Sequence, residues 1–209
     1  ALANVVKAYL ERAGYKTICF TTGSEAINYI GNKVDIWILD IMLGDDVNGY
    51  DVIKAIREQD DNVPVIFTSA RDQELDKIFG LELGSDDYMT KPYSSKELVL
   101  RVNKIIKRVY KDNSQVNIIN YDDYVINLDK RTVELDKKNI KLTTLEFDLL
   151  VLLIKNKSKC FSREEILDKV WGSDYFGTDR VVDDLIRRLR KKLDKLNVEA
   201  VYGYGYRLS

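Results

Sequence analysis

The chain has 209 residues, of which 45% are hydrophobic and 32% charged, with 33 Lys and Arg against 34 Asp and Glu and no histidine. This length is enough for two ordinary domains, each with its own core. The absence of an apolar run of about 18 residues argues against a membrane-spanning helix, and the absence of histidine excludes His-based catalysis and most zinc sites.

The cysteines and the first residues indicate a cytoplasmic protein. Cys19 and Cys160 are far apart and form no CxxC pair, so we expect both to be buried, reduced thiols. The first residues have the pattern of an amphipathic helix rather than of a basic secretory leader.

The first half of the chain alternates between helical and strand-like segments. Amphipathic patterns predict helices over residues 2–13, 24–32, 49–58, 72–84 and 94–111. Apolar, β-branched runs between them predict strands over residues 16–22, 34–40, 63–70 and 87–92. Apolar strands that alternate with helices indicate a parallel sheet covered on both faces, which is the doubly wound α/β class.

The pattern changes after the polar stretch 111–115. The second half of the chain predicts a small α+β domain with a β-meander, three helices and a terminal hairpin. The meander is expected over 117–142, the helices over 144–156, 162–172 and 180–196, and the hairpin over 200–209. We therefore predict a first domain at 1–110, a linker at 111–115 and a second domain at 116–209.

Three reactive side chains come directly after apolar strands in the first half. Asp40, Ser69 and Lys91 each stand at the expected carboxyl end of a strand, where open parallel sheets bind their ligands. If these strands are neighbours, the three side chains meet in one crevice. A carboxylate can attack phosphorus, and a lysine can balance the charge of the added phosphoryl group, so the trio indicates phosphoryl transfer. A cis peptide bond before Pro92 would aim the Lys91 ammonium inward.

The predicted helix at 180–196 has two opposite faces. Between residues 180 and 195 there are seven basic and three acidic side chains. The apolar face consists of Val182, Leu185, Ile186, Leu189, Leu193 and Leu196. The opposite face consists of Arg180, Asp184, Arg187, Arg188, Lys191 and Lys195. A cationic ridge of this kind is typical of a helix that enters the major groove of DNA.

These motifs resemble a known family over nearly the whole chain. The stretches ILDIMLGDDVNGYDVIKAIR, PVIFTSA and GSDDYMTKPYSSKEL resemble a response-regulator receiver domain. The stretches LTTLEFDLLVLLIKN, SREEILDKVWG, RVVDDLIRRLRKKL and VYGYGYRL resemble the winged-helix effector domain of the OmpR/PhoB type. The resemblance implies a flavodoxin-like receiver followed by a winged helix-turn-helix domain, in a transcription regulator that is not an enzyme.

The resemblance also implies roles for individual residues. Asp40 would accept a phosphoryl group from a sensor histidine kinase, and Mg²⁺ would be bound by its carboxylate and by the backbone carbonyl of Met42. Ser69 and Lys91 would hold the phosphoryl group, and Tyr88 would turn inward as Ser69 moves. Slow autodephosphorylation is implied as well.

Two interaction surfaces are implied by the same resemblance. A homodimer would form through the helix at 72–84, the strand at 87–92 and the helix after it, with contacts from Lys77, Ile78, Leu81, Asp87, Glu97, Val99 and Arg101. In that dimer Lys77 would pair with Glu97, and Asp87 with Arg101. Double-stranded DNA with tandem sites would be bound by Arg180, Arg187, Arg188 and Lys191 on the basic helix and by Arg207 on the wing. RNA polymerase is a further expected partner, and a membrane is not.

The chain departs from the family pattern in two places. The family begins with a strand that ends in an acidic pair binding Mg²⁺, whereas this sequence starts within the helix after that strand and shows no such pair. We therefore expect the natural chain to start earlier. After Asp40, Gly44 and Asn48 stand where the family has Pro and Gly, and Gly49 comes next, which indicates one inserted residue.

The departures leave an alternative open, namely a regulator that binds DNA without phosphorylation and uses its receiver only to dimerise. An aspartate-nucleophile phosphatase is disfavoured, because that class needs a second aspartate two residues after the first and position 42 is Met.

Overall fold

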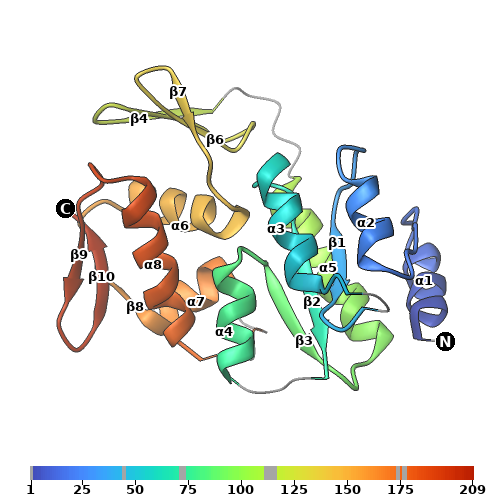
Figure 1. The fold of residues 1–209 in the computed structure, drawn as a ribbon. Coiled ribbons are helices and arrows are strands. Elements are labelled where there is room, and N and C mark those ends of the chain that lie inside the picture. Colours follow the sequence, from blue (N-terminus) through green and yellow to red (C-terminus); the bar gives the residue numbers. More distant parts are fainter. Residues whose placement is uncertain (1, 44–45, 71–73, 111–116, 173–174, 176–177) are drawn as a thin grey trace. The chain divides into compact units, whose positions relative to one another are not determined.

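The computed structural model describes residues 2–43, 46–70, 74–110, 117–172, 175 and 178–209 (Figure 1). The chain forms two compact units, Ala1–Lys111 and Asp112–Ser209. The predicted linker at 111–115 and the residues Gly44 and Asp45 lie outside the described residues. None of the described helices has the length and apolar character that a bilayer crossing requires.

The first unit is a parallel sheet with helices on both faces, which confirms the predicted fold class. The sheet has the order β1-β2-β3, with β1 at Trp37–Asp40, β2 at Val65–Ser69 and β3 at Asp87–Thr90. The helices are α1 at Leu2–Arg12, α2 at Gly23–Tyr29, α3 at Gly49–Gln59, α4 at Glu74–Glu82 and α5 at Ser95–Val109.

Each face of this sheet has its own apolar cluster. Side chains of α2 and α3 pack on one face around Val52, Ile53 and Phe67, and side chains of α1 and α5 pack on the other around Leu10 and Leu98 (Figure 1). All residues of β2 are buried, because this central strand is covered from both sides. The strands therefore read as continuous apolar runs in the sequence.

The strand predicted over residues 16–22 is absent from the structure, where residues 16–20 are irregular and residues 21 and 22 form a bend. A strand needs a neighbour to satisfy its backbone groups. In the 2-1-3-4-5 order of flavodoxin-like sheets, a first strand separates the second from the third. Within the described residues β1 pairs only with β2, so the segment at 16–22 has no strand beside it.

The second unit consists of a meander, three helices and a small sheet, as the sequence predicts. The meander comprises β4 at Ile118–Tyr121, β5 at Tyr124–Asn127, β6 at Thr132–Leu135 and β7 at Lys138–Ile140. The helices are α6 at Thr144–Lys155, α7 at Arg163–Val170 and α8 at Arg180–Lys192. The last helix thus ends earlier than the predicted residue 196.

The terminal hairpin belongs to a sheet that the sequence reveals only in part. Strands β9 at Val198–Val201 and β10 at Gly205–Leu208 form the predicted hairpin, and β10 also pairs with the short strand β8 at Phe161–Ser162. A methyl group added at Gly205 would lie 2.0 Å from the carbonyl oxygen of Phe161. Glycine at this position therefore permits the contact between β8 and β10.

The cysteines differ from the expectation of two buried thiols. Both are free, but Cys19 is exposed and Cys160 is half-buried. Cys19 lies in the segment at 16–22 and is part of the lining of a cavity beside β1.

Candidate functional site

The carboxyl ends of the three parallel strands bring the predicted trio together. Asp40 ends β1 opposite Thr68, and Ser69 ends β2 opposite Thr90. The backbone N–H of Lys91 donates to the carbonyl of Ser69 at 2.6 Å. Asp40, Ser69 and Lys91 therefore meet at one edge of the sheet, as the sequence predicts for neighbouring strands.

Asp40 forms an ion pair with Lys91 at this edge. The Lys91 ammonium contacts one carboxylate oxygen of Asp40, and the other oxygen accepts a hydrogen bond from the backbone N–H of Met42 at 3.1 Å. The Asp40 side chain remains 32% exposed, so a donor molecule in solvent can reach it. The Lys91–Pro92 peptide bond is cis, and Ser69 is fully buried behind the carboxylate edge.

The described residues provide only part of a Mg²⁺ site. Mg²⁺ prefers six oxygen ligands in octahedral geometry and is usually held by one or two carboxylates. Within the described ranges no three His, Cys, Asp or Glu side chains cluster so that they could hold a metal ion. The Asp40 carboxylate and the Met42 carbonyl would therefore supply only part of the ligands of such an ion.

Tyr88, the predicted switch residue, is buried in this structure. Its side chain is 7% exposed, and its ring centre lies 6.4 Å from that of Phe67. The Phe67 ring also contacts Tyr50 edge-to-face at 5.4 Å, and Tyr50 contacts Phe79 of α4 at 4.9 Å. Aromatic contacts therefore connect the sheet below Asp40 with α3 and α4.

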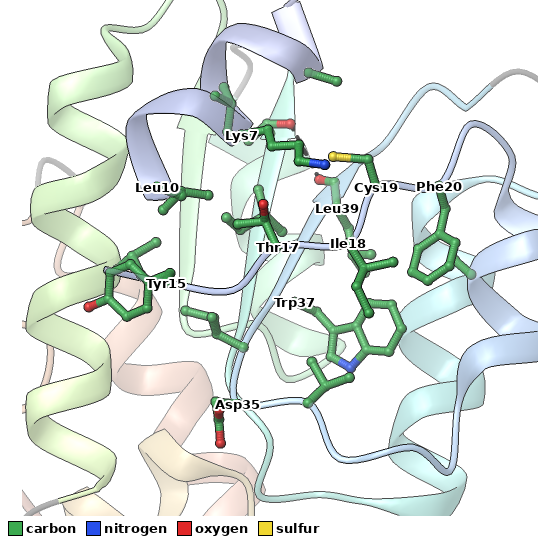
Figure 2. A pocket seen from close by; sticks show the side chains of 18 of the residues that line it. Lys7, Leu10, Tyr15, Thr17, Ile18, Cys19, Phe20, Asp35, Trp37 and Leu39 are labelled. Atoms are coloured by element: carbon green, nitrogen blue, oxygen red, sulfur yellow. Dashed lines mark hydrogen bonds between the residues drawn. The ribbon is translucent and has the colours of Figure 1, made fainter. Parts of the chain in front are cut away.

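A cavity of about 1030 Å³ runs along the outer edge of β1 (Figure 2). Its lining includes the consecutive residues Lys33–Asp40 and the facing segment Tyr15–Phe20. Figure 2 shows Leu10, Trp37 and Leu39 among the side chains around this space. The cavity lies between the segment at 16–22 and β1, so within the described residues β1 has a strand neighbour only on its β2 side.

Tyr93 is a polar group of this site that the sequence motifs did not indicate. It lines the same cavity as Asp40, Thr68 and Lys91. Burial raises the pKa of the Tyr93 phenol, and a hydrogen bond with the Thr68 side chain and the charge of Lys91 oppose this rise. In the sequence, the only indication that Tyr93 belongs to this site is its position directly after Lys91 and Pro92.

The proposed dimer contacts have different environments. Arg101 lies between Asp87 and Glu97 of its own chain, with a nitrogen–oxygen distance of 2.7 Å to each. Burial raises the pKa of the Asp87 carboxyl, and the guanidinium of Arg101 opposes this rise. Ile78 and Val99 are half-buried.

Leu81 and Lys77, the two remaining residues of the predicted dimer contact, are not seen on the surface. Leu81 is only 2% exposed, because α4 turns this side chain into the interior. The side chain of Lys77 lies outside the described residues.

The basic helix α8 packs its apolar face inward, as predicted. The buried side chains of the stripe are Val182, Leu185, Ile186, Leu189, Leu193 and Leu196. Arg180, Arg187 and Lys191 are exposed, and Arg187 is ion-paired with Asp184 at 2.7 Å. An exposed cationic surface with a firmly packed back is therefore present.

Arg188 differs from the other basic residues of α8. Its side chain is only 12% exposed and lies 4.0 Å from the carboxylate of Glu146, a buried residue of α6. Lys192 contacts the same carboxylate at 2.8 Å, and Glu146 also completes the capping box of α6 with Thr143. Arg188 thus helps to hold α8 on α6. The Thr143–Glu146 capping box marks the start of α6 in the sequence but does not indicate the pairing with Arg188.

Comparisons with known proteins agree in both halves of the chain. Residues 1–103 match the family model "Response regulator receiver domain", and residues 137–208 match "Transcriptional regulatory protein, C terminal". The chain is 50% identical to the transcriptional regulatory protein CssR of Bacillus subtilis (strain 168), over 99% of this chain and 93% of that protein.

Two further comparisons extend this result. The chain is 38% identical to the response regulator SaeR of Staphylococcus aureus (strain USA300), over 99% of this chain and 92% of that protein. A solved structure of a RitR mutant matches with a TM-score of 0.78 at 24% identity, covering 100% of this chain and 94% of that one. At this identity the structural likeness shows the fold alone.

Proposed function

Because this chain belongs to the response regulators of the OmpR/PhoB type, we propose that phosphorylation of Asp40 switches its binding to DNA. The family places a receiver before a DNA-binding effector domain and works in transcription regulation. It implies a histidine kinase and DNA as partners, and its members are typically not enzymes. We place the protein in the cytoplasm, where it meets DNA.

The observation that carries the proposal is the Asp40–Lys91 pair at the carboxyl edge of the sheet. One oxygen of Asp40 attacks the phosphorus of a kinase phosphohistidine, so that a P–O bond forms as the P–N bond breaks. The electron pair passes to the imidazole nitrogen, which takes a proton from solvent. The acyl phosphate carries a charge of about −1.5 to −2, like other protein phosphates, where the carboxylate carried −1, and Lys91 lies in place to balance part of the increase.

Ser69 and Tyr88 would transmit the change. Ser69 ends the strand next to Asp40, and Tyr88 packs against Phe67 of the same strand. A shift of β2 toward the phosphoryl group therefore reaches the aromatic contacts of α3 and α4. This is the path by which we expect the output surface to sense phosphorylation.

Receiver domains generally bind Mg²⁺ for phosphorylation. In this chain Asp40 and the carbonyl of Met42 are the donors that we assign to the ion, and they need further ligands to complete it. The chemistry that the ion supplies when bound is neutralisation of negative charge during the transfer.

The proposal is tested by mass spectrometry after incubation with acetyl phosphate, with and without Mg²⁺. We expect the chain to gain one phosphoryl group and the Asp40→Ala variant to gain none, because the nucleophilic carboxylate is gone. Asp46→Asn is the matched control, since this exposed carboxylate lies in the same acidic loop and should leave the gain unchanged. Equal labelling of wild type and Asp40→Ala would overturn the assignment.

A second candidate is DNA binding that does not depend on phosphorylation, with the receiver acting only as a dimerisation module. The altered loop after Asp40, where Gly44 and Asn48 stand in place of the family's Pro and Gly, keeps it open. In that case acetyl phosphate with Mg²⁺ would leave both the mass and the DNA affinity of the wild type unchanged.

We assign the DNA-binding surface to Arg180, Arg187 and Lys191, which are exposed on α8. Arg188 and Arg207 complete the set predicted from the sequence. Arg188 is 12% exposed against Glu146, whereas Arg207 pairs with Glu199 and remains 47% exposed. The dimer surface comprises α4, β3 and α5, and RNA polymerase is the partner expected once the dimer is on DNA.

A further inference from the structure

The first residues of α3 are bonded to the backbone that carries the phosphoacceptor. The N–H of Gly49, which begins α3, donates to the carbonyl of Ile41 at 3.1 Å, and Ile41 directly follows Asp40 in the chain. The side chain of Asn48 caps the helix and accepts from the N–H of Tyr50 at 2.9 Å. A displacement of the Asp40 backbone therefore acts on the hydrogen bonds that fix the start of α3.

The ring of Tyr50 connects this end of α3 with α4. Its centre lies 4.9 Å from that of Phe79 on α4, with an angle of 81° between the ring planes, which is the favoured edge-to-face arrangement. Tyr50 also contacts Phe67 of β2 edge-to-face at 5.4 Å. Phe79 is 43% exposed, whereas Tyr50 is half-buried, so the Tyr50 ring forms the inner wall against which the Phe79 ring rests.

The backbone of α4 lies directly on the rings of the sheet at Gly80. A methyl group added at Gly80 would lie 3.1 Å from a ring carbon of Phe67 and 3.2 Å from one of Tyr88. The position of α4 on the sheet therefore follows these two rings. Because Phe79 precedes Gly80, the Tyr50 ring stands beside the point at which α4 rests.

Helix α3 holds the other end of α4 as well. A guanidinium nitrogen of Arg57 donates to the carbonyl of Gly84, just after the end of α4, at 2.8 Å. Tyr50 and Arg57 are seven residues apart, so they lie on the same face of α3. Close-packed interiors have low compressibility and transmit strain. Helix α3 therefore forms a stiff connection between the Asp40 backbone and α4.

We propose that Tyr50 is a positioning residue that transmits the phosphorylation of Asp40 to α4 through the start of α3. This route begins at the backbone of Asp40, whereas the proposed switch through Ser69 and Tyr88 begins at the phosphoryl group. Tyr50 acts through Phe79 and sets where α4 lies within the proposed dimer surface. The inference rests on the proposed phosphorylation switch and adds a residue to it.

The test replaces Tyr50 in the full chain and measures dimerisation by sedimentation after treatment with acetyl phosphate and Mg²⁺. For Tyr50→Leu we expect a normal gain of one phosphoryl group but a dimer dissociation constant that is larger by about tenfold, the upper range for an aromatic pair. Tyr50→Phe keeps the ring and should dimerise as the wild type does. This rescue by the conservative variant would assign the effect to the ring contact.

Tyr29→Leu is the matched control. Tyr29 of α2 is also half-buried and packs against the same apolar cluster as Tyr50, and its ring centre lies 5.2 Å from that of Phe20. Its loss should lower the melting temperature about as much as Tyr50→Leu does, and it should leave the dimer dissociation constant unchanged. If Tyr50 served stability alone, the two variants would behave alike in both measurements.

A double-mutant cycle tests whether Tyr50 acts through Phe79. Phe79→Leu changes α4 itself and can weaken the dimer directly, but this direct effect occurs with and without Tyr50 and therefore cancels in the cycle. We expect Tyr50→Leu to cause no further loss of dimer affinity when Phe79→Leu is already present. A further tenfold loss in the double variant would overturn the route through Phe79.

Hydrogen exchange followed by mass spectrometry gives a readout on the single chain. The amides of α4, Glu74–Glu82, should exchange faster in Tyr50→Leu than in the wild type and in Tyr29→Leu, because α4 loses its inner wall. Unchanged exchange in α4 would show that Tyr50 does not hold this helix and would overturn the inference.

The remaining outcomes separate this inference from the proposed function. If Tyr50→Leu is phosphorylated and dimerises as the wild type does, transmission through Tyr50 is overturned and the proposed switch stands. If the wild type is phosphorylated but remains a monomer, the dimer surface is overturned together with this inference. If the wild type gains no phosphoryl group, the proposed function itself fails, and transmission through Tyr50 fails with it.

Discussion

At the scale of single residues, Gly49 has a role that its sequence position only hinted at. It begins α3, and its N–H donates to the carbonyl of Ile41 at 3.1 Å. A methyl group at Gly49 would lie 2.4 Å from the carbonyl oxygen of Asp40. The preceding residue, Asn48, caps α3 in a capping box with Asp51. The glycine thus lets the helix start directly against the backbone that carries the phosphoacceptor.

We therefore expect Gly49→Ala to disturb both stability and the site. The added methyl group must push away the backbone of Asp40, which should cost about 1–3 kcal/mol of unfolding free energy, as overpacking usually does. Phosphorylation by acetyl phosphate should also slow, because the carboxylate moves relative to Lys91. Thermal unfolding and the rate of mass gain measure the two effects.

Gly31→Ala is the matched control for this prediction. Gly31 has a φ of +99° and its added methyl group would meet the end of Gln59, at the opposite end of α3. It should lower stability through backbone strain and leave the phosphorylation rate of the folded protein unchanged. A normal rate in Gly49→Ala would show that the close approach to Asp40 does not matter for the reaction.

At the scale of the elements, neighbouring arginines of α8 that look alike in the sequence have different environments. Arg187 is 61% exposed on its outer side, whereas Arg188 is 12% exposed against the buried Glu146. Adjacent residues in a helix are about 100° apart, so one can face solvent while the next packs on a neighbouring helix. The two arginines should consequently give different mutant phenotypes.

For Arg187→Ala we expect weaker DNA binding and a salt slope that is lower by about one unit, since one phosphate contact is lost. For Arg188→Ala we expect a loss of about 1–3 kcal/mol of stability, because Glu146 remains buried with fewer partners. Anisotropy titrations and thermal unfolding of both variants provide the comparison. Equal salt slopes in the wild type and Arg187→Ala would contradict the assignment of Arg187 to a phosphate.

The elements also show where the sequence alone was insufficient. The apolar run at 16–22 has the composition of a strand, but a strand forms only where a neighbour can pair with it. Helix periodicity placed the apolar face of α8 correctly and could not identify Glu146 as the partner of Arg188, because that partner is 42 residues away in the chain. The family resemblance implied that Leu81 lies on the dimer surface, but its side chain is buried in the structure.

At the scale of the whole molecule, the proposed switch requires two chains. A single effector domain has few groups for DNA binding, and two domains on tandem sites gain affinity through effective concentration. In the single chain Arg101 is held by Asp87 and Glu97 of the same chain. A salt bridge from Arg101 to the other subunit would replace a salt bridge within its own chain, so its net gain in binding free energy is small. We therefore expect most of the binding free energy of the dimer to come from apolar contacts.

The variant Ile78→Glu tests this expectation. Ile78 is half-buried on α4, and a carboxylate there would be desolvated without a partner in the dimer. After phosphorylation the wild type should sediment as a dimer and Ile78→Glu as a monomer, with an affinity for tandem sites that is lower by about 100-fold. Its phosphorylation at Asp40 should be unchanged.

Val5→Glu is the control for the dimer, because Val5 is an exposed apolar residue on α1 and not on the proposed face. It should dimerise as the wild type does. A phosphorylated Ile78→Glu variant that still forms a dimer would exclude α4 from the interface.

The sequence by itself determined the fold class, the order of the elements and the candidate phosphoacceptor with its lysine. These depend on local periodicity, on capping residues and on the rule that parallel strands end at one edge of a sheet. Only the tertiary structure decided which side chains can meet a ligand, namely that Arg188 packs against the buried Glu146 while its neighbour Arg187 is exposed. The physical reason is that ion pairing and burial depend on partners distant in the chain, which a local pattern does not specify.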